Sequence, residues 1–321
     1  MNTIRSIIKV SRPIHWVKNV SLFAALIFSG QLFSEYQFVS VIVAFIAFGF
    51  ATSATYIFND ILDVKRDQLH PIKKKRPIAS GALPVSVAIF TLACFTLLSI
   101  LLSSGLPALF LFSIYTYLIL QFFYSIWLKH IPVIDILVIA TGFVIRVYAG
   151  AFVIDAHLSV WFLLCVISVA LFLASGKRRA ELGVVGESGE QGKTRSTLSH
   201  YTRPLLNSYV TMFGSAAWLS WALFTYNESP PVDVQFWTYL AEISKTTTIS
   251  KLLMITIPVV IFGIMRYESL IFEDRSEAPE KVLLTDKSLI ISLLLWAGLV
   301  IWILYGISPT TSFPDLPTVI K

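Results

Sequence analysis

The chain has 321 residues, of which 56% are hydrophobic and only 14% are charged, and its mean hydropathy is +0.75. Soluble globular proteins carry about 25% charged residues, so the composition excludes an ordinary soluble domain. The net charge of +6 lies in short polar segments beside long apolar runs, which favours membrane orientation over nucleic-acid binding. Cys94 and Cys165 each lie within an apolar run, so no disulfide framework is expected.

Residues 1–19 are predicted to form an interfacial amphipathic segment. Residues 2–12 place isoleucines on one helical stripe and Arg5, Lys9 and Arg12 on another. That pattern suits a helix lying on the cytoplasmic leaflet. Pro13 interrupts the region and no convincing cleavage site follows, so we do not expect a cleavable signal.

Apolar runs that cross about 30 Å of hydrocarbon need about 20 residues each. We expect about nine such spans, near residues 20–34, 38–58, 83–103, 106–127, 132–153, 158–175, 205–225, 250–268 and 288–306. The predicted fold is therefore all-α: one integral membrane domain, residues 1–321, whose helices enclose a polar cavity open to the cytoplasm.

Lysine and arginine fall mainly on one side of these spans. The three large polar connections on that side are residues 59–82, 176–204 and 269–287. The opposite side holds little beyond Lys245, Lys251 and Lys321. Because positively charged loops stay inside, we expect a multi-pass protein of the cell (inner) membrane, with its N-terminus and its active site facing the cytoplasm.

An acidic cluster follows the second expected span. Asn59, Asp63 and Asp67 are four residues apart and share a helical face, and Asp60 lies within a turn of them. Carboxylates at this spacing repel one another unless a cation neutralises them. Mg²⁺ takes one or two carboxylates together with substrate phosphates and water. The alternative is a solvated acidic face of a loop helix. Because charged side chains are costly at the end of a membrane span, the functional interpretation is favoured.

Cations follow the acidic cluster directly. His70, Lys73 and Arg76 lie within nine residues of Asp67, with Lys74 and Lys75 between them. Lysine supplies a point charge and arginine a bidentate fork, and a diphosphate next to a metal needs both. The alternative is that these cations only set the membrane orientation. His70 and His130 are expected to position substrate, since a phosphate nucleophile is already anionic.

Taken together, this segment resembles the first aspartate-rich motif of the UbiA-type membrane prenyltransferases. The matching residues are Asn59-Asp60-x2-Asp63-x3-Asp67-x2-His70-Pro71-x-Lys73-x2-Arg76-Pro77-Ile78-Ala79-Ser80-Gly81. Three further stretches are similar to the decaprenyl-phosphate phosphoribosyltransferase branch of that superfamily. They are His15-Trp16-Val17-Lys18-Asn19, Tyr124-x3-Leu128-Lys129-His130 and Gly176-Lys177-Arg178-Arg179-Ala180-Glu181-Leu182.

The resemblance implies a Mg²⁺-dependent transfer of 5-phosphoribosyl from phosphoribosyl pyrophosphate to a polyprenyl (decaprenyl-type) phosphate. Pyrophosphate is released, and the product would serve cell-wall arabinan synthesis. The implied catalytic residues are Asn59, Asp63, Asp67, Lys73 and Arg76, of which Asn59, Asp63 and Asp67 hold the metal. The implied substrate-binding residues are Lys18, Asp60, His70, Tyr124, Lys129, Arg146, Lys177 and Arg178. A homo-oligomer is left open, and no nucleic-acid partner is expected.

The sequence departs from the superfamily pattern after the sixth expected span. Typical members carry a second Asp-x3-Asp motif there, whereas residues 176–204 contain no aspartate and open with Lys177, Arg178 and Arg179. One carboxylate cluster facing one cationic cluster suits a donor that carries both a diphosphate and a separate phosphate. Membrane-end charge, or an i,i+4 pair of Lys177 with Glu181, is the alternative.

Arg146 and Asp135 lie in the fifth expected span, eleven residues apart and on one helical face. An arginine at membrane depth is costly unless it faces a partner or a polar cavity. Arg146 is therefore either a substrate-binding residue or part of a buried structural pair with a carboxylate or with helix carbonyls.

Two other functions compete with this interpretation. One is a prenyltransferase that moves a prenyl group from a prenyl diphosphate to an aromatic acceptor, and the missing second aspartate motif argues against it. The other is a membrane transporter. The ionisable residues gather at one face of the membrane and the two halves show no evident repeat, which argues against transport.

Overall fold

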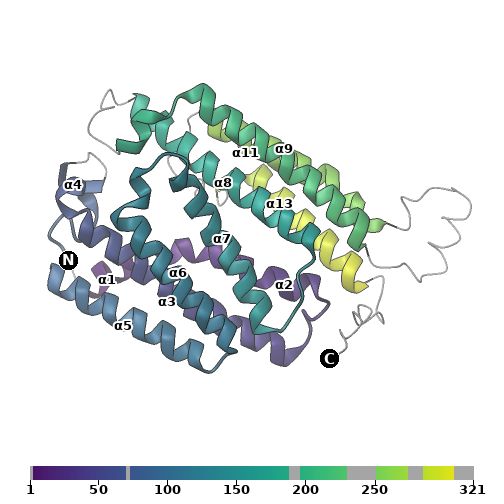
Figure 1. Ribbon diagram of the computed structural model, residues 1–321, viewed down its shortest axis with the longest axis horizontal. Coiled ribbons are helices and arrows are strands. Elements are labelled where there is room, and N and C mark those ends of the chain that lie inside the picture. The colour runs from purple at the N-terminus through teal and green to yellow at the C-terminus, as the bar shows by residue number, and fades with distance from the viewer. Residues whose placement is uncertain (1–2, 70–72, 188–195, 230–250, 274–284, 307–321) are drawn as a thin grey trace, which may run out of the picture. The chain divides into compact units, whose positions relative to one another are not determined.

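The computed structural model describes residues 3–69, 73–187, 196–229, 251–273 and 285–306 (Figure 1). Within these ranges all regular structure is helical, which confirms the predicted all-α class. Among the described residues, seven helical segments are long and apolar enough to cross a membrane: Glu35–Leu62, Val85–Ser104, Ala108–Ile126, Ile134–Val153, Val160–Gly183, Leu252–Phe272 and Lys287–Gly306. The protein is therefore a multi-pass membrane protein.

The chain divides into two compact units, of which the first comprises residues 1–26, 34–156 and 185–202. Its longer helices are α1 (Thr3–Ser11), α3 (Glu35–Leu62), α5 (Val85–Ser104), α6 (Ala108–Ile126) and α7 (Ile134–Val153). Its shorter helical segments are η1 (Pro13–Leu22), α4 (Val64–Leu69), η2 (Lys73–Lys75), η3 (Leu128–His130) and η4 (Ser196–His200).

Helix α3 is the centre of the first unit. It packs against α5, α6 and η1, and α6 in turn pairs with α7. With 28 residues, α3 is about 42 Å long, which exceeds the hydrocarbon thickness of about 30 Å. Its last turn can therefore carry polar residues beyond the hydrocarbon. Asn59 and Asp60 lie in that turn.

The second unit comprises residues 27–33, 157–184 and 203–321. Its helices are α8 (Val160–Glu187, up to residue 184), α9 (Arg203–Glu228), η5 (Leu252–Thr256), α11 (Ile257–Phe272), α13 (Lys287–Ile301) and the π-helical turn η6 (Trp302–Gly306). Helix α11 packs against α9 and α13. Phe172, Val210, Tyr267 and Leu289 belong to the core that these helices share. The boundary between the two units falls within helix α2 (Phe23–Phe28), after residue 26.

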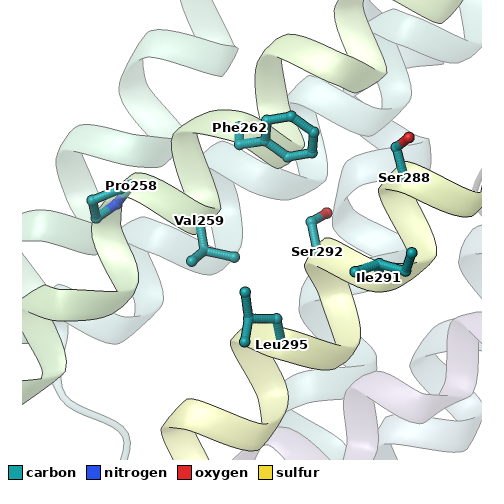
Figure 2. A pocket seen from close by; sticks show the side chains of 7 residues that line it. All are labelled: Pro258, Val259, Phe262, Ser288, Ile291, Ser292 and Leu295. Carbon is teal, nitrogen blue, oxygen red and sulfur yellow. The ribbon is translucent and has the colours of Figure 1, made fainter.

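An apolar groove runs between α11 and α13 in the second unit (Figure 2). Its volume is about 440 Å³, and it is lined by Pro258, Val259, Phe262, Ser288, Ile291, Ser292 and Leu295. Two serine hydroxyls are the polar side-chain groups in this lining, so the groove offers no means of binding a diphosphate or a metal.

Three of the expected segments differ from the structure. The expected first span at 20–34 is not one long helix, because the 3₁₀ segment η1 passes into the six-residue α2, and the chain turns at Gly30 with φ 76°. The span at 205–225 corresponds to α9, which is long enough to cross a membrane but more polar than the seven segments above. The connection at 176–204 begins as helix, because α8 continues to Glu187, and residues 177–182 at the start of this extension have good helix propensity.

Candidate active site

The polar residues of the first unit gather where α3 ends. The helix stops at Leu62, Asp63 occupies the C-cap with φ −92° and ψ 5°, and the chain resumes as α4. Backbone hydrogen bonds from Asp63 N to Asn59 O (3.0 Å) and from Asp67 N to Asp63 O (2.8 Å) keep the two helices nearly continuous. The break at Asp63 divides the predicted acidic cluster into two groups.

The first group is built around the ammonium of Lys129, in η3. Lys129 Nζ donates to Asn59 Oδ1 at 3.2 Å and to the two carboxylate oxygens of Asp63 at 2.9 and 2.8 Å. The Lys129 side chain is 2% exposed. Arg66 approaches the same carboxylate more distantly, at 3.9 Å, from an exposed position. Three oxygen atoms therefore converge on a single buried cation.

The backbone around Lys129 is held by the segment around η4. The hydroxyl of Thr197 donates to the backbone carbonyl of Lys129 at 2.7 Å. The hydroxyl of Tyr201 accepts from Val133 N at 2.6 Å and donates to Asp135 Oδ1 at 2.7 Å. Val133 has φ 68°, a conformation that a β-branched residue rarely adopts, so these contacts fix a strained turn after η3.

The second group joins Asp60 and Asp67 through arginines. Arg76 donates to Asp60 Oδ1 at 3.0 Å and to Asp67 Oδ2 at 2.6 Å. Arg12 donates to both oxygens of Asp60, at 2.6 and 2.8 Å. Both carboxylates are buried, and Asp60 is only 2% exposed. The network therefore fastens the N-terminal segment and the segment around η2 to the end of α3.

The pKa of Asp67 reflects two opposing effects. Burial raises the pKa of its carboxyl, whereas the charge and the hydrogen bond of Arg76 lower it, and the balance is a raised pKa. The neighbouring carboxylate of Asp60 raises it further and the charge of Lys73 lowers it. Lys73 lies in η2, close enough to act on this group electrostatically.

The N-terminal segment presents basic side chains to Tyr56 on α3. The Arg12 guanidinium lies 4.9 Å from the Tyr56 ring centroid, and the His15 ring centroid lies 4.8 Å from it. Lys18 Nζ donates to the Tyr56 hydroxyl at 3.5 Å. Lys18, which the sequence predicted to bind substrate, therefore contacts a residue that lies one helical turn before Asn59 and Asp60 on α3.

Arg146 is buried in the core of the first unit and does not pair with Asp135. Its guanidinium donates to Asn19 Oδ1 at 2.8 Å, to the Gly142 carbonyl at 2.6 Å and to the Tyr117 hydroxyl at 2.9 Å. These neutral acceptors come from η1, α6 and α7 itself. Of the two roles that the sequence left open, the geometry favours the structural one, with a helix carbonyl and neutral side chains as partners.

The remaining predicted site residues lie apart from these two groups or outside the described residues. Tyr124 is half-buried on α6, and His70 falls outside the described residues. Lys177 and Arg178 lie on α8 in the second unit, where Arg178 is buried and pairs with Glu181. Their approach to the carboxylates of the first unit stays a prediction.

Several residues at the site were not predicted from the sequence. Arg12 was assigned only to the interfacial stripe, and Thr197 and Tyr201 were not singled out. The contacts of Thr197 and Tyr201 join segments about 68 residues apart, which no periodicity reveals. Asn19, the partner of Arg146, belongs to the His15–Asn19 stretch that resembles the family. That resemblance was the sequence signal that could have pointed to Asn19.

The donor set of the first group fits a magnesium ion. Asn59 and Asp63 present hard oxygen atoms that already converge on a cation at 2.8–3.2 Å. Within the described ranges, no three His, Cys, Asp or Glu side chains converge closely enough to hold a metal by themselves. Mg²⁺ commonly completes such a partial set with substrate phosphates and water, so the residues fit a metal that binds together with a diphosphate.

Comparisons with known proteins place the chain in a family. The UbiA prenyltransferase family matches residues 20–178. The chain is 34% identical to decaprenyl-phosphate phosphoribosyltransferase of Corynebacterium glutamicum over 95% of this chain and 88% of that protein. It is 33% identical to the protein of the same name from Mycolicibacterium smegmatis, over 92% of each chain.

The fold likeness extends over nearly the whole chain. A UbiA homolog from Archaeoglobus fulgidus, solved with DMAPP and Mg²⁺, superposes with a TM-score of 0.65 at 16% identity, covering 95% of this chain and all of that one. The chain belongs to the UbiA prenyltransferase family and is a membrane-embedded transferase of that superfamily. Within the superfamily it falls in the decaprenyl-phosphate phosphoribosyltransferase branch.

Proposed function

We propose that the protein transfers 5-phosphoribosyl from phosphoribosyl pyrophosphate to a polyprenyl phosphate of the decaprenyl type. The bond between ribose C1 and the diphosphate oxygen breaks, a bond forms between C1 and an oxygen of the lipid phosphate, and pyrophosphate leaves. The observation that carries the proposal is the convergence of Asn59, Asp63 and Lys129 on one point, in a chain similar to enzymes named for this reaction.

The residues of the first unit have distinct roles in this proposal. Asn59 and Asp63 would hold Mg²⁺, with Asp67 completing the carboxylate set from α4. When bound, the metal neutralises charge that develops on the leaving diphosphate. Lys129, Lys73 and Arg76 would bind diphosphate oxygens, and Lys18, which contacts Tyr56, would bind a second phosphate. The lipid phosphate is already anionic near neutral pH, so no side chain is needed as a strong base.

The second phosphate of the donor is assigned to the cations on α8. Lys177 and Arg178 stand where related enzymes carry a second aspartate motif, and we propose that they bind the 5-phosphate or the lipid phosphate. His70 and Tyr124 would position substrate. The Glu181 partner of Arg178 would have to share that guanidinium with the phosphate.

The membrane setting follows from the charge distribution. We propose that the protein lies in the cell (inner) membrane with its N-terminus and active site on the cytoplasmic side, as one transferase domain. Helix α1 would lie on the leaflet, since Ile4 and Ile8 are 65% and 57% exposed beside the exposed cations Arg5 and Lys9. The product would supply cell-wall arabinan synthesis.

A reconstitution with purified enzyme tests the function. Protein in detergent is incubated with polyprenyl phosphate and radiolabelled phosphoribosyl pyrophosphate, with and without Mg²⁺. We expect labelled lipid and stoichiometric pyrophosphate only when Mg²⁺ is present. Turnover of a prenyl diphosphate with an aromatic acid, together with none of the phosphoribosyl donor, would replace this proposal with an ordinary prenyltransferase.

A further inference from the structure

The ammonium of Lys129 occupies the position that a metal bound by Asn59 and Asp63 would need. It contacts Asn59 Oδ1 and both carboxylate oxygens of Asp63 within 3.2 Å, and its side chain is 2% exposed. A metal ion at this position would lie at contact distance from the ammonium, and the repulsion between two cations so close together is poorly screened in a buried site. Metal binding therefore requires that the Lys129 ammonium leave the Asp63 carboxylate.

The displacement can be limited to the side chain. The backbone of Lys129 is fixed in η3, where its carbonyl accepts from the Thr197 hydroxyl at 2.7 Å. The lysine side chain has four flexible methylenes, so Nζ can withdraw without moving that backbone. A buried ammonium that leaves its carboxylate needs another anion, since an uncompensated buried charge is costly.

We propose that Lys129 is a built-in cation that makes metal binding conditional on the donor's diphosphate. In the free enzyme Lys129 neutralises Asp63 and competes with the metal. When a diphosphate arrives, its oxygens accept the ammonium and the vacated oxygens of Asn59 and Asp63 take the metal. The inference rests on the proposed function, and it adds that the metal and the diphosphate bind cooperatively through Lys129.

The test measures Mn²⁺ binding by electron paramagnetic resonance on the full-length protein, with and without pyrophosphate. Wild type should bind Mn²⁺ weakly alone and about tenfold or more tightly with pyrophosphate. Lys129→Gln should bind Mn²⁺ about tenfold or more tightly than wild type without pyrophosphate, and most of the cooperativity should be lost. Lys74→Gln, which removes an exposed cation from η2, is the matched control and should behave as wild type.

Acetylation of wild-type Lys129, followed by mass spectrometry, keeps the test independent of how well the variant folds. Lys129 should be protected in the free enzyme, reactive with saturating Mn²⁺ alone, and protected again when pyrophosphate is added. Equal Mn²⁺ affinity of wild type and Lys129→Gln, or unchanged acetylation on adding Mn²⁺, would overturn the inference while leaving the proposed function intact. Failure of every form to bind Mn²⁺ with pyrophosphate would overturn both.

Discussion

Asp60 and Asp63 lie within one turn of each other, yet their carboxylates have different partners. Asp63 faces Lys129 and is 18% exposed, whereas Asp60 is enclosed by the guanidinium groups of Arg12 and Arg76. A carboxylate whose partner can be exchanged for a metal suits catalysis. A carboxylate enclosed by two arginines suits the scaffold.

This difference predicts opposite outcomes for two matched substitutions. Asp63→Asn should lower Mg²⁺-dependent turnover by about a hundredfold or more, because an amide cannot neutralise the metal. Asp60→Asn should instead destabilise the fold by roughly 3 kcal/mol or more, since it removes the buried carboxylate that pairs with both Arg12 and Arg76. Turnover and thermal unfolding of both variants in detergent check this. Equal loss of stability in the two variants would contradict the assignment.

Arg76 also determines how Asp67 titrates. Burial already raises the pKa of Asp67 and Arg76 opposes that rise, so Arg76→Gln should raise the pKa further. A carboxyl with a raised folded-state pKa favours stability at low pH and loses that contribution as pH rises through the folded value. The stability of Arg76→Gln should therefore fall more steeply than that of wild type as the pH rises above the ordinary carboxyl pKa of about 4. If the free energies of unfolding of wild type and Arg76→Gln changed by the same amount as the pH rises, the prediction would be refuted.

At the scale of elements, the apolar runs predicted the helices well and the polar contacts poorly. The expected spans at 83–103, 106–127 and 132–153 correspond closely to α5, α6 and α7, because each run is bounded by Pro, Gly or polar residues. The 20–34 region did not form one helix, and its composition alone does not distinguish η1 and α2 from a span. Contacts such as Lys129 with Asp63 depend on how η3 is packed, which sequence spacing does not encode.

Arg146 shows how one residue connects several elements. It ties η1, α6 and α7 together through Asn19, Tyr117 and Gly142. Arg146→Met should cost on the order of 3 kcal/mol of stability, because three buried acceptors lose a charged donor. Thermal unfolding checks this, with donor affinity measured alongside. A variant of wild-type stability that binds phosphoribosyl pyrophosphate weakly would restore the substrate-binding role considered from the sequence.

For the whole molecule, the charge distribution predicts the orientation. Single cysteines are introduced at Lys74 in η2 and at Ser104, the last residue of α5, in a background without Cys94 and Cys165. The Lys74 position should react with an impermeant maleimide only from the cytoplasm, and the Ser104 position only from outside, because α5 lies between them. Labelling of both from the same side would mean that α5 does not cross the membrane.

The most direct measurement is a structure of the enzyme with Mn²⁺ and phosphoribosyl pyrophosphate, with the metal located by anomalous scattering. We expect an anomalous peak within bonding distance of Asn59 Oδ1 and the Asp63 carboxylate. We also expect donor diphosphate oxygens on the metal, and Lys129 Nζ moved from Asp63 to the diphosphate. A metal bound away from Asn59 and Asp63, or a diphosphate held with Lys129 still paired to Asp63, would contradict it.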